Sequence, residues 1–166
     1  MENRPDLAFE HAKAYEMKSG GCPQCTIAGI FDALGIRNDD VFKAATGLAD
    51  GVGLTGNGHC GALSGGCLVI GLLYGRDMQD FGKIGKLLKA NQLSKQLHDW
   101  FVAEYGSARC NEVQTAQVGR FYNLYDPEEF KAGLEAGLLD KCSTLVGAVA
   151  RKTTQIILAE QAAGAE

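Results

Sequence analysis

The chain has 166 residues, of which 46% are hydrophobic and 22% are charged, and its formal net charge is −4. This length and composition predict one globular domain, residues 1–166, that is large enough to bury a core. The acidic balance, with no cluster of Lys and Arg, excludes a protein that binds nucleic acid through a basic surface.

Two features of the sequence bear on its location. Residues 1–6 include no basic start followed by an apolar stretch, so we expect no signal peptide. The longest apolar run, residues 68–74, is too short to cross a bilayer. We therefore expect a cytoplasmic protein with no membrane partner, in which six cysteines favour metal or redox chemistry over structural disulfides.

Helical spacing of apolar residues recurs along the chain, and no run alternates β-branched with polar residues. We therefore predict an all-α, single-domain bundle of about six to seven helices. The expected helical segments are 6–18, 22–34, 39–49, about 60–74, 80–105, a short turn at 110–113, one from 127 and a last one from about 142. Residues 114–125 fit a loop or a short helix equally well, and the tail 161–166 is expected to fray.

The stretch from Gly51 to Gly66 is dense in glycine, with seven glycines in its sixteen residues. Such a density indicates that the backbone adopts positive φ or approaches another group closely. The stretch leads into the apolar run 68–74, which we expect to be a buried central helix. A nucleotide phosphate loop is excluded because no Lys-Ser/Thr pair follows the glycines and no strand precedes them.

Four cysteines stand at or near the start of an expected helix: Cys22, Cys60, Cys110 and Cys142. Backbone N–H groups and the positive end of the helix dipole favour thiolates at such positions. The dipole supplies only about half a charge and fades within one turn, so it cannot hold four thiolates together. A cation between them is needed, and iron and zinc are the candidates.

Cys25 and Cys67 follow Cys22 and Cys60 by three and seven residues, respectively. At about 100° per residue, both would lie on the same inner helix face as their partners, deeper in the bundle. They could be additional ligands, a redox pair or small buried hydrophobic residues. Cys22 and Cys25 together could also form a redox dithiol at a helix start, although the thioredoxin context of a βαβ unit is missing.

Four segments resemble the C_GCAxxG_C_C family of redox-active proteins: Cys22 with the helix after it, Cys60-Gly-Ala-Leu-Ser-Gly65, Tyr105-Gly-Ser-Ala-Arg-Cys110-Asn-Glu, and Cys142-Ser-Thr-Leu-Val-Gly-Ala-Val-Ala. The resemblance covers about residues 20–159. A related domain accompanies an iron–sulfur centre in split-Soret cytochrome c, which also makes a homodimer plausible here. The chain departs from the family label at Gly61, where the label has alanine. It also lacks a haem attachment signal.

The resemblance implies redox activity and cluster ligation by the four cysteines. Cys25 and Cys67 are additional to the family pattern; these two cysteines are further candidate ligands, and Gly58 and Gly61 are candidates for contact with the cofactor. We therefore expect an iron–sulfur protein that relays electrons to a partner protein, and whether it is also an enzyme stays open. Two alternatives remain at this stage. One is a thiol/disulfide oxidoreductase that uses Cys22 and Cys25, and the other is a non-catalytic helical module with structural zinc or buried thiols.

Overall fold

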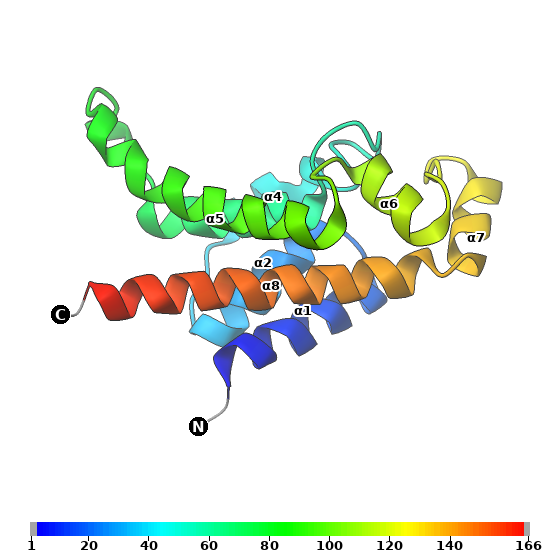
Figure 1. The fold of residues 1–166 in the computed structure, drawn as a ribbon, viewed down its shortest axis with the longest axis horizontal. Helices are drawn as coiled ribbons and strands as arrows, with labels where there is room; N and C mark the ends of the chain where they lie inside the picture. Colours follow the sequence, from blue (N-terminus) through cyan, green and yellow to red (C-terminus); the bar gives the residue numbers. More distant parts are fainter. Residues whose placement is uncertain (1–2, 165–166) are drawn as a thin grey trace.

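The computed structural model describes residues 3–164, and Figure 1 shows that their fold is all-α. Over these residues the chain forms eight α-helices: α1 (Arg4–Ser19), α2 (Cys22–Leu34), α3 (Asp39–Ala44), α4 (Gly61–Tyr74), α5 (Leu88–Tyr105), α6 (Cys110–Val118), α7 (Pro127–Glu135) and α8 (Leu138–Ala163). Three short 3-10 helices complete it: η1 (Ala45–Leu48), η2 (Met78–Asp80) and η3 (Ile84–Leu87). The predicted fold class is confirmed.

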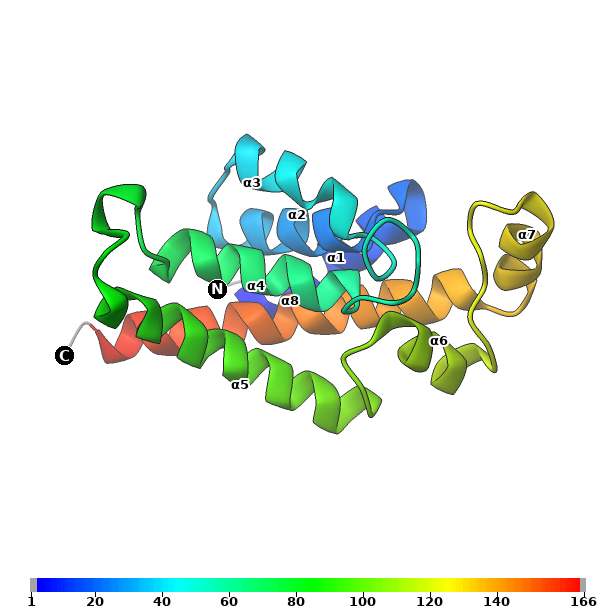
Figure 2. The same cartoon turned by 90° about the horizontal axis from the view of Figure 1, so that it is seen from above.

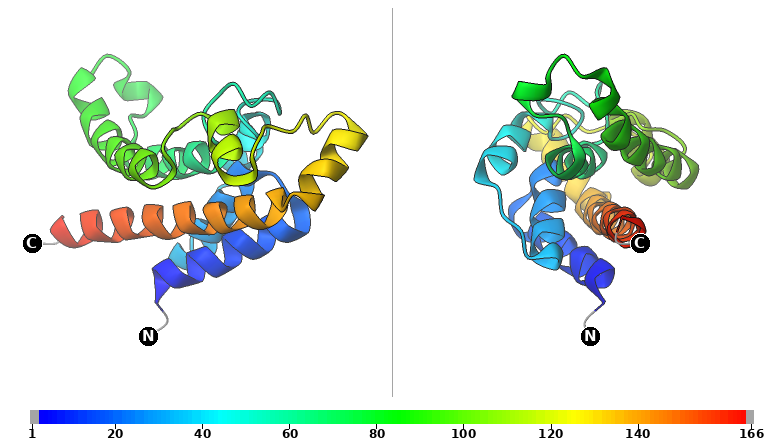
Figure 3. Two further views of the ribbon diagram at one scale, coloured as in Figure 1. Left: turned by 45° about the vertical axis from the view of Figure 1, so that its right-hand side comes forward. Right: turned by 90° about the vertical axis from the view of Figure 1, so that its left-hand side faces the viewer.

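The long helix α8 is the axis of the bundle, since it packs against α1, α2, α4 and α5 (Figure 2). Seen along the bundle in Figure 3, these five helices surround a common interior, and α3 lies outside α2. Helices α6 and α7 lie at one end of the bundle. The glycine-rich loop lies near the same end and leads into α4, as predicted.

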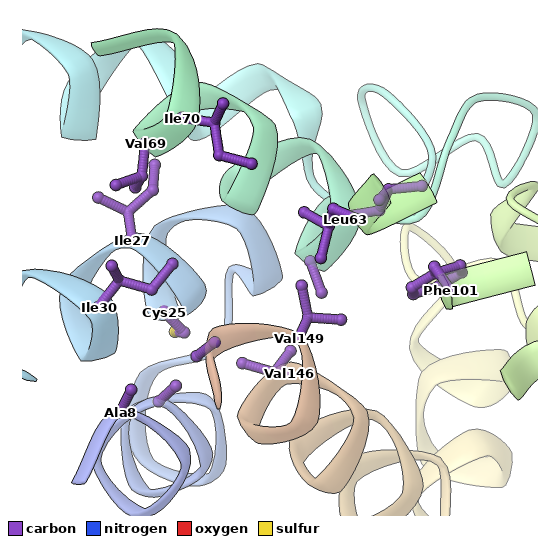
Figure 4. Packing of buried hydrophobic residues seen from close by; sticks show 14 of the residues in the cluster. Ala8, Cys25, Ile27, Ile30, Leu63, Val69, Ile70, Phe101, Val146 and Val149 are labelled. Atoms are coloured by element: carbon purple, nitrogen blue, oxygen red, sulfur yellow. The ribbon is translucent and has the colours of Figure 1, made fainter. Parts of the chain in front are cut away.

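The core is formed by apolar stripes from all the long helices. Figure 4 shows Ile27 and Ile30 of α2, Val69 and Ile70 of α4, Phe101 of α5, and Val146 and Val149 of α8 together in the interior. Each of these residues is at most 7% exposed. Ile27 and Ile30 are three residues apart, as are Val146 and Val149, and this spacing places two side chains on one face of a helix.

Helices α1 and α2 approach each other closely where small residues meet. A Cβ atom added at Gly29 would lie 2.5 Å from the Cβ of Ala12 and 2.7 Å from the carbonyl oxygen of Ala8. We expect Gly29→Ala to lower the free energy of unfolding by about 1–3 kcal/mol, because the helices must move apart to admit the methyl group. Urea denaturation followed by far-UV circular dichroism measures the change.

Gly71 is the matched control, because a Cβ atom there would meet no atom within 4 Å. We expect Gly71→Ala to raise the free energy of unfolding by about 0.5–1 kcal/mol, since glycine in a helix interior is less favourable than alanine by this amount. The two substitutions should therefore have opposite signs, and a stabilising Gly29→Ala would contradict the close packing of α1 on α2.

The structure corrects several predicted boundaries. The helix expected over 80–105 begins only at Leu88, because Gly82 and Gly85 interrupt it and residues 78–87 form turns and 3-10 helices instead. Helix α6 continues to Val118, beyond the expected turn at 110–113. In the tail expected to fray, α8 continues to Ala163, while residues 165–166 lie outside the described residues. No helix within residues 3–164 combines the length and apolarity needed to span a membrane.

Candidate metal centre

One cavity of about 380 Å³ is lined by four cysteines that are far apart in the sequence: Cys22, Cys60, Cys110 and Cys142. It lies at the end of the bundle where α1 ends and α2, α4, α6 and α8 begin (Figure 1). Cys60 and Cys110 are buried, and Cys22 and Cys142 are partly exposed. We call this space the cysteine cavity.

Three of these thiols lie at the start of a helix. Cys22 is the first residue of α2, after Gly20 and Gly21, which turn the chain with φ of 65° and 91°. Cys60 is the N-cap of α4, and Cys110 is the first residue of α6. The expected position of the fourth is corrected, because α8 begins at Leu138 and Cys142 therefore lies in the second turn of the helix.

The glycine-rich loop opens with a left-handed turn. The five residues from Asp50 to Leu54 have φ of 48°, 73°, 69°, 57° and 59°. Three of them are not glycine, and Val52 is β-branched, so this backbone is strained by roughly 1–2 kcal/mol at each such residue. Strain of this kind persists only where the surroundings enforce it, and it clusters at functional sites.

Hydrogen bonds fix this loop to the segment that carries Cys110. The Cys60 amide donates to the carbonyl of Ala108 at 2.8 Å, and the Cys110 amide donates to the carbonyl of Gly58 at 3.0 Å. His59 and Arg109 form an isolated antiparallel bridge between the two segments. Gly58 does not itself line the cysteine cavity; its observed role is to hold Cys110 next to Cys60.

Gly61 brings α4 close to the thiol of Cys22. A Cβ atom at this position would lie 2.4 Å from Cys22 Sγ and 2.9 Å from Cδ of Pro23. The missing side chain thus leaves room for the Cys22 thiol, which is a physical reason for glycine where the family label has alanine.

Burial raises the pKa of all four thiols, and for Cys60 it raises the pKa to about 11. A thiolate at Cys60 would further raise the pKa of Cys22, Cys110 and Cys142, which reflects how near they lie to one another. The amides of Ala62 and Leu63 oppose the shift at Cys60, since they favour its thiolate. Without a cation in the cavity, the thiols are therefore held in their neutral form.

Two buried carboxylates, Glu16 and Asp50, also line the cysteine cavity, and the sequence analysis did not identify them. Their side chains are only 8% and 7% exposed, and burial raises the pKa of each. Asp50 Oδ1 accepts hydrogen bonds from Cys110 Sγ at 3.1 Å and from the Gln114 amide. The available sequence signals were weak: Asp50 directly precedes the glycine stretch, and Glu16 continues the helix stripe of Ala8 and Ala12.

Cys25 and Cys67 do not line this cavity. Cys25 is buried beside Glu16, and its thiol donates to the carbonyl of Gly20 at 3.1 Å. Cys67 lies in a separate groove between α4 and α5, which is also lined by His59, Ser94 and His98. The expected shared face of Cys60 and Cys67 is therefore wrong, because Cys60 precedes the helix and the rotation of 100° per residue does not apply to it.

The four thiols line a common cavity but do not form a site for a single metal ion. Among residues 3–164, no three His, Cys, Asp or Glu side chains converge closely enough to hold a single metal ion.

Comparison with protein families matches residues 21–156 to the family described as "Putative redox-active protein (C_GCAxxG_C_C)". The matched range contains all four cysteines of the cavity. Comparisons with curated proteins and with solved structures found no match. Because the family match extends over well more than half of the 166 residues, the chain belongs to the C_GCAxxG_C_C family.

Proposed function

We propose that this protein binds an iron–sulfur cluster in the cysteine cavity and exchanges electrons with a partner protein. The observation that carries the proposal is that four cysteines from α2, the N-cap of α4, α6 and α8 line one cavity. Membership of a redox-active family supports it. Buried thiols in a core would have no need to surround a common space.

The residues of the cavity fit a cluster by their chemistry. Thiolates are the usual ligands of iron–sulfur clusters. A bound metal favours the thiolate and reverses the effect of burial, so the neutral thiols found here would release their protons on binding. Gly61 does not line the cavity, but its missing side chain leaves room beside α4 for the Cys22 thiol that does.

A cluster suits the spread of the donors better than a single zinc ion. Structural zinc draws four ligands into one tetrahedron with zinc–sulfur bonds of about 2.3 Å. The described side chains do not converge on such a point, whereas a cluster distributes its ligands over several metal atoms. The proposal therefore places iron and sulfide in the space between the thiols.

When bound, an iron–sulfur cluster supplies one-electron redox chemistry whose potential depends on charge, burial and hydrogen bonds to sulfur. The protein controls each of these factors. The amides of Ala62 and Leu63 favour negative charge on Cys60. The nearby carboxylates of Glu16 and Asp50 would lower the reduction potential of the cluster, because negative charge disfavours reduction.

The test is purification under anaerobic conditions, followed by measurement of iron, acid-labile sulfide, zinc and visible absorption. We expect a coloured protein with thiolate-to-iron absorption bands and with both iron and sulfide. A colourless protein without iron would refute the proposal. In that case, a change of two in the thiol count on reduction would identify a dithiol oxidoreductase, and stoichiometric zinc would identify a structural site.

A further inference from the structure

The cysteine cavity has polar groups that the proposed cluster does not satisfy. Three buried oxygen atoms on its lining residues have no hydrogen-bond partner: Glu16 Oε2, Asp50 Oδ2 and Gln114 Oε1. None of the ion pairs found in residues 3–164 includes Glu16 or Asp50. Burying such groups without partners is costly, so their retention indicates a partner that binds.

All three orphaned atoms are hydrogen-bond acceptors, and two of them belong to carboxylates. The sulfur atoms of a cluster and its cysteine thiolates are also acceptors, so they cannot satisfy these oxygens when Glu16 and Asp50 are ionised. Deprotonation of Cys110 for metal binding would also remove the hydrogen bond that it donates to Asp50. A bound cluster therefore increases the need for positive charge and for N–H donors at this wall of the cavity.

Most of the remaining lining of the cavity is apolar, and Lys18 and Ser19 at the end of α1 are the other polar side chains on it. The cavity wall near α7 consists of Leu124, Phe130, Leu134, Leu138 and Leu139. Phe130 and Leu134 are about half exposed, so this apolar side is in contact with solvent. The volume of about 380 Å³ falls in the range of small-molecule sites, which pair an apolar lining with a few placed polar groups.

We propose that the cysteine cavity binds a small primary ammonium ligand, with its charged nitrogen at Glu16 and Asp50 and its short apolar body against the α7 wall. An ammonium group supplies both the positive charge and the three N–H donors that match the orphaned oxygens. The redox role of this ligand rests on the proposed function, because it would lie beside the cluster, but its binding is measurable separately.

The experiment is a calorimetric titration of the anaerobically purified protein with n-butylammonium chloride at constant ionic strength. We expect saturable binding that exceeds the binding of 1-butanol, which has the same apolar body without the charge. Glu16→Gln and Asp50→Asn should each weaken the binding of n-butylammonium by roughly tenfold or more, because each removes a charge-assisted contact. Both replacements preserve shape, and asparagine tolerates the positive φ of Asp50.

Asp80→Asn is the matched control. Asp80 is a carboxylate that is 6% exposed, but Lys83 and Lys86 pair with it and it lies outside the cavity. We expect its replacement to leave n-butylammonium binding unchanged, and circular dichroism verifies that all three variants fold.

Three results would each overturn the inference: no n-butylammonium binding, binding by Glu16→Gln and Asp50→Asn that is as tight as that of the unaltered protein, or saturable binding of Mn²⁺ in place of n-butylammonium. The iron content of the same samples tests the proposed function separately. A preparation without iron refutes the proposed electron transfer through a cluster. A preparation that contains iron but does not bind n-butylammonium refutes only the proposed ammonium site.

Discussion

Replacement of Cys60 by serine should reduce the iron retained by the anaerobically purified protein by about 100-fold or more. Even the loss of a group that only supports a ligand commonly lowers metal affinity 10–100-fold, and Cys60 would itself be a ligand. Its thiol lies near the other three, since a thiolate at Cys60 would raise the pKa of Cys22, Cys110 and Cys142. Iron analysis and visible absorption of the purified variant measure the effect.

Cys67→Ser is the matched control for this substitution. Cys67 lies on the same helix but lines the groove between α4 and α5, not the cysteine cavity. We expect the Cys67 variant to keep its iron and its spectrum. If both variants lost iron equally, or if neither did, the four-cysteine ligand set would be incorrect.

Gly51→Ala should lower the free energy of unfolding by about 3 kcal/mol, through strain at positive φ and through overpacking. Gly51 has φ of 73°, and a Cβ atom there would lie 2.7 Å from the carbonyl carbon of Gly56 and 2.9 Å from Cβ of Cys110. The methyl group would therefore push apart the glycine loop and the start of α6. Chemical denaturation measures the stability, and iron content should fall with it because Cys110 is displaced.

Gly53→Ala separates the two causes, because Gly53 has φ of 57° but a Cβ atom there would meet nothing within 4 Å. We expect this variant to lose only about 1 kcal/mol, which corresponds to backbone strain without a collision. Equal losses at Gly51 and Gly53 would show that the approach of the loop to Cys110 does not constrain the site.

Much of the fold was predictable because its signals are local. Cys22–Leu34 agrees with the predicted helix at both ends, since Pro23 lies in its first turn and Gly35 ends it with φ of 67°. Asp126 caps α7 as expected by accepting from the amides of Glu128 and Glu129. Residues 80–87 were wrongly predicted as helix because the apolar spacing continues through Gly82 and Gly85, yet the apolar residues there, such as Ile84, are exposed.

The site was predictable only in part, because sequence shows types of residue but not which faces meet. The family pattern selected the four cysteines that line the cavity, but it does not include Glu16 or Asp50. Glu16 lies on α1, which is only weakly amphipathic, so the sequence does not distinguish its buried carboxylate from one at the surface. Cys67 was misplaced because its angle was counted from Cys60, a residue that is not helical.

The order of the cysteines along the chain has a consequence for how the protein matures. One comes from the second helix and another from the eighth, so a growing chain lacks the full set of four cysteines until residue 142 has been added. Insertion of the proposed cluster would therefore follow synthesis of Cys142, and its binding would stabilise the assembled fold by mass action. The proposed cluster would thus bind only after the start of α8 has joined the earlier helices.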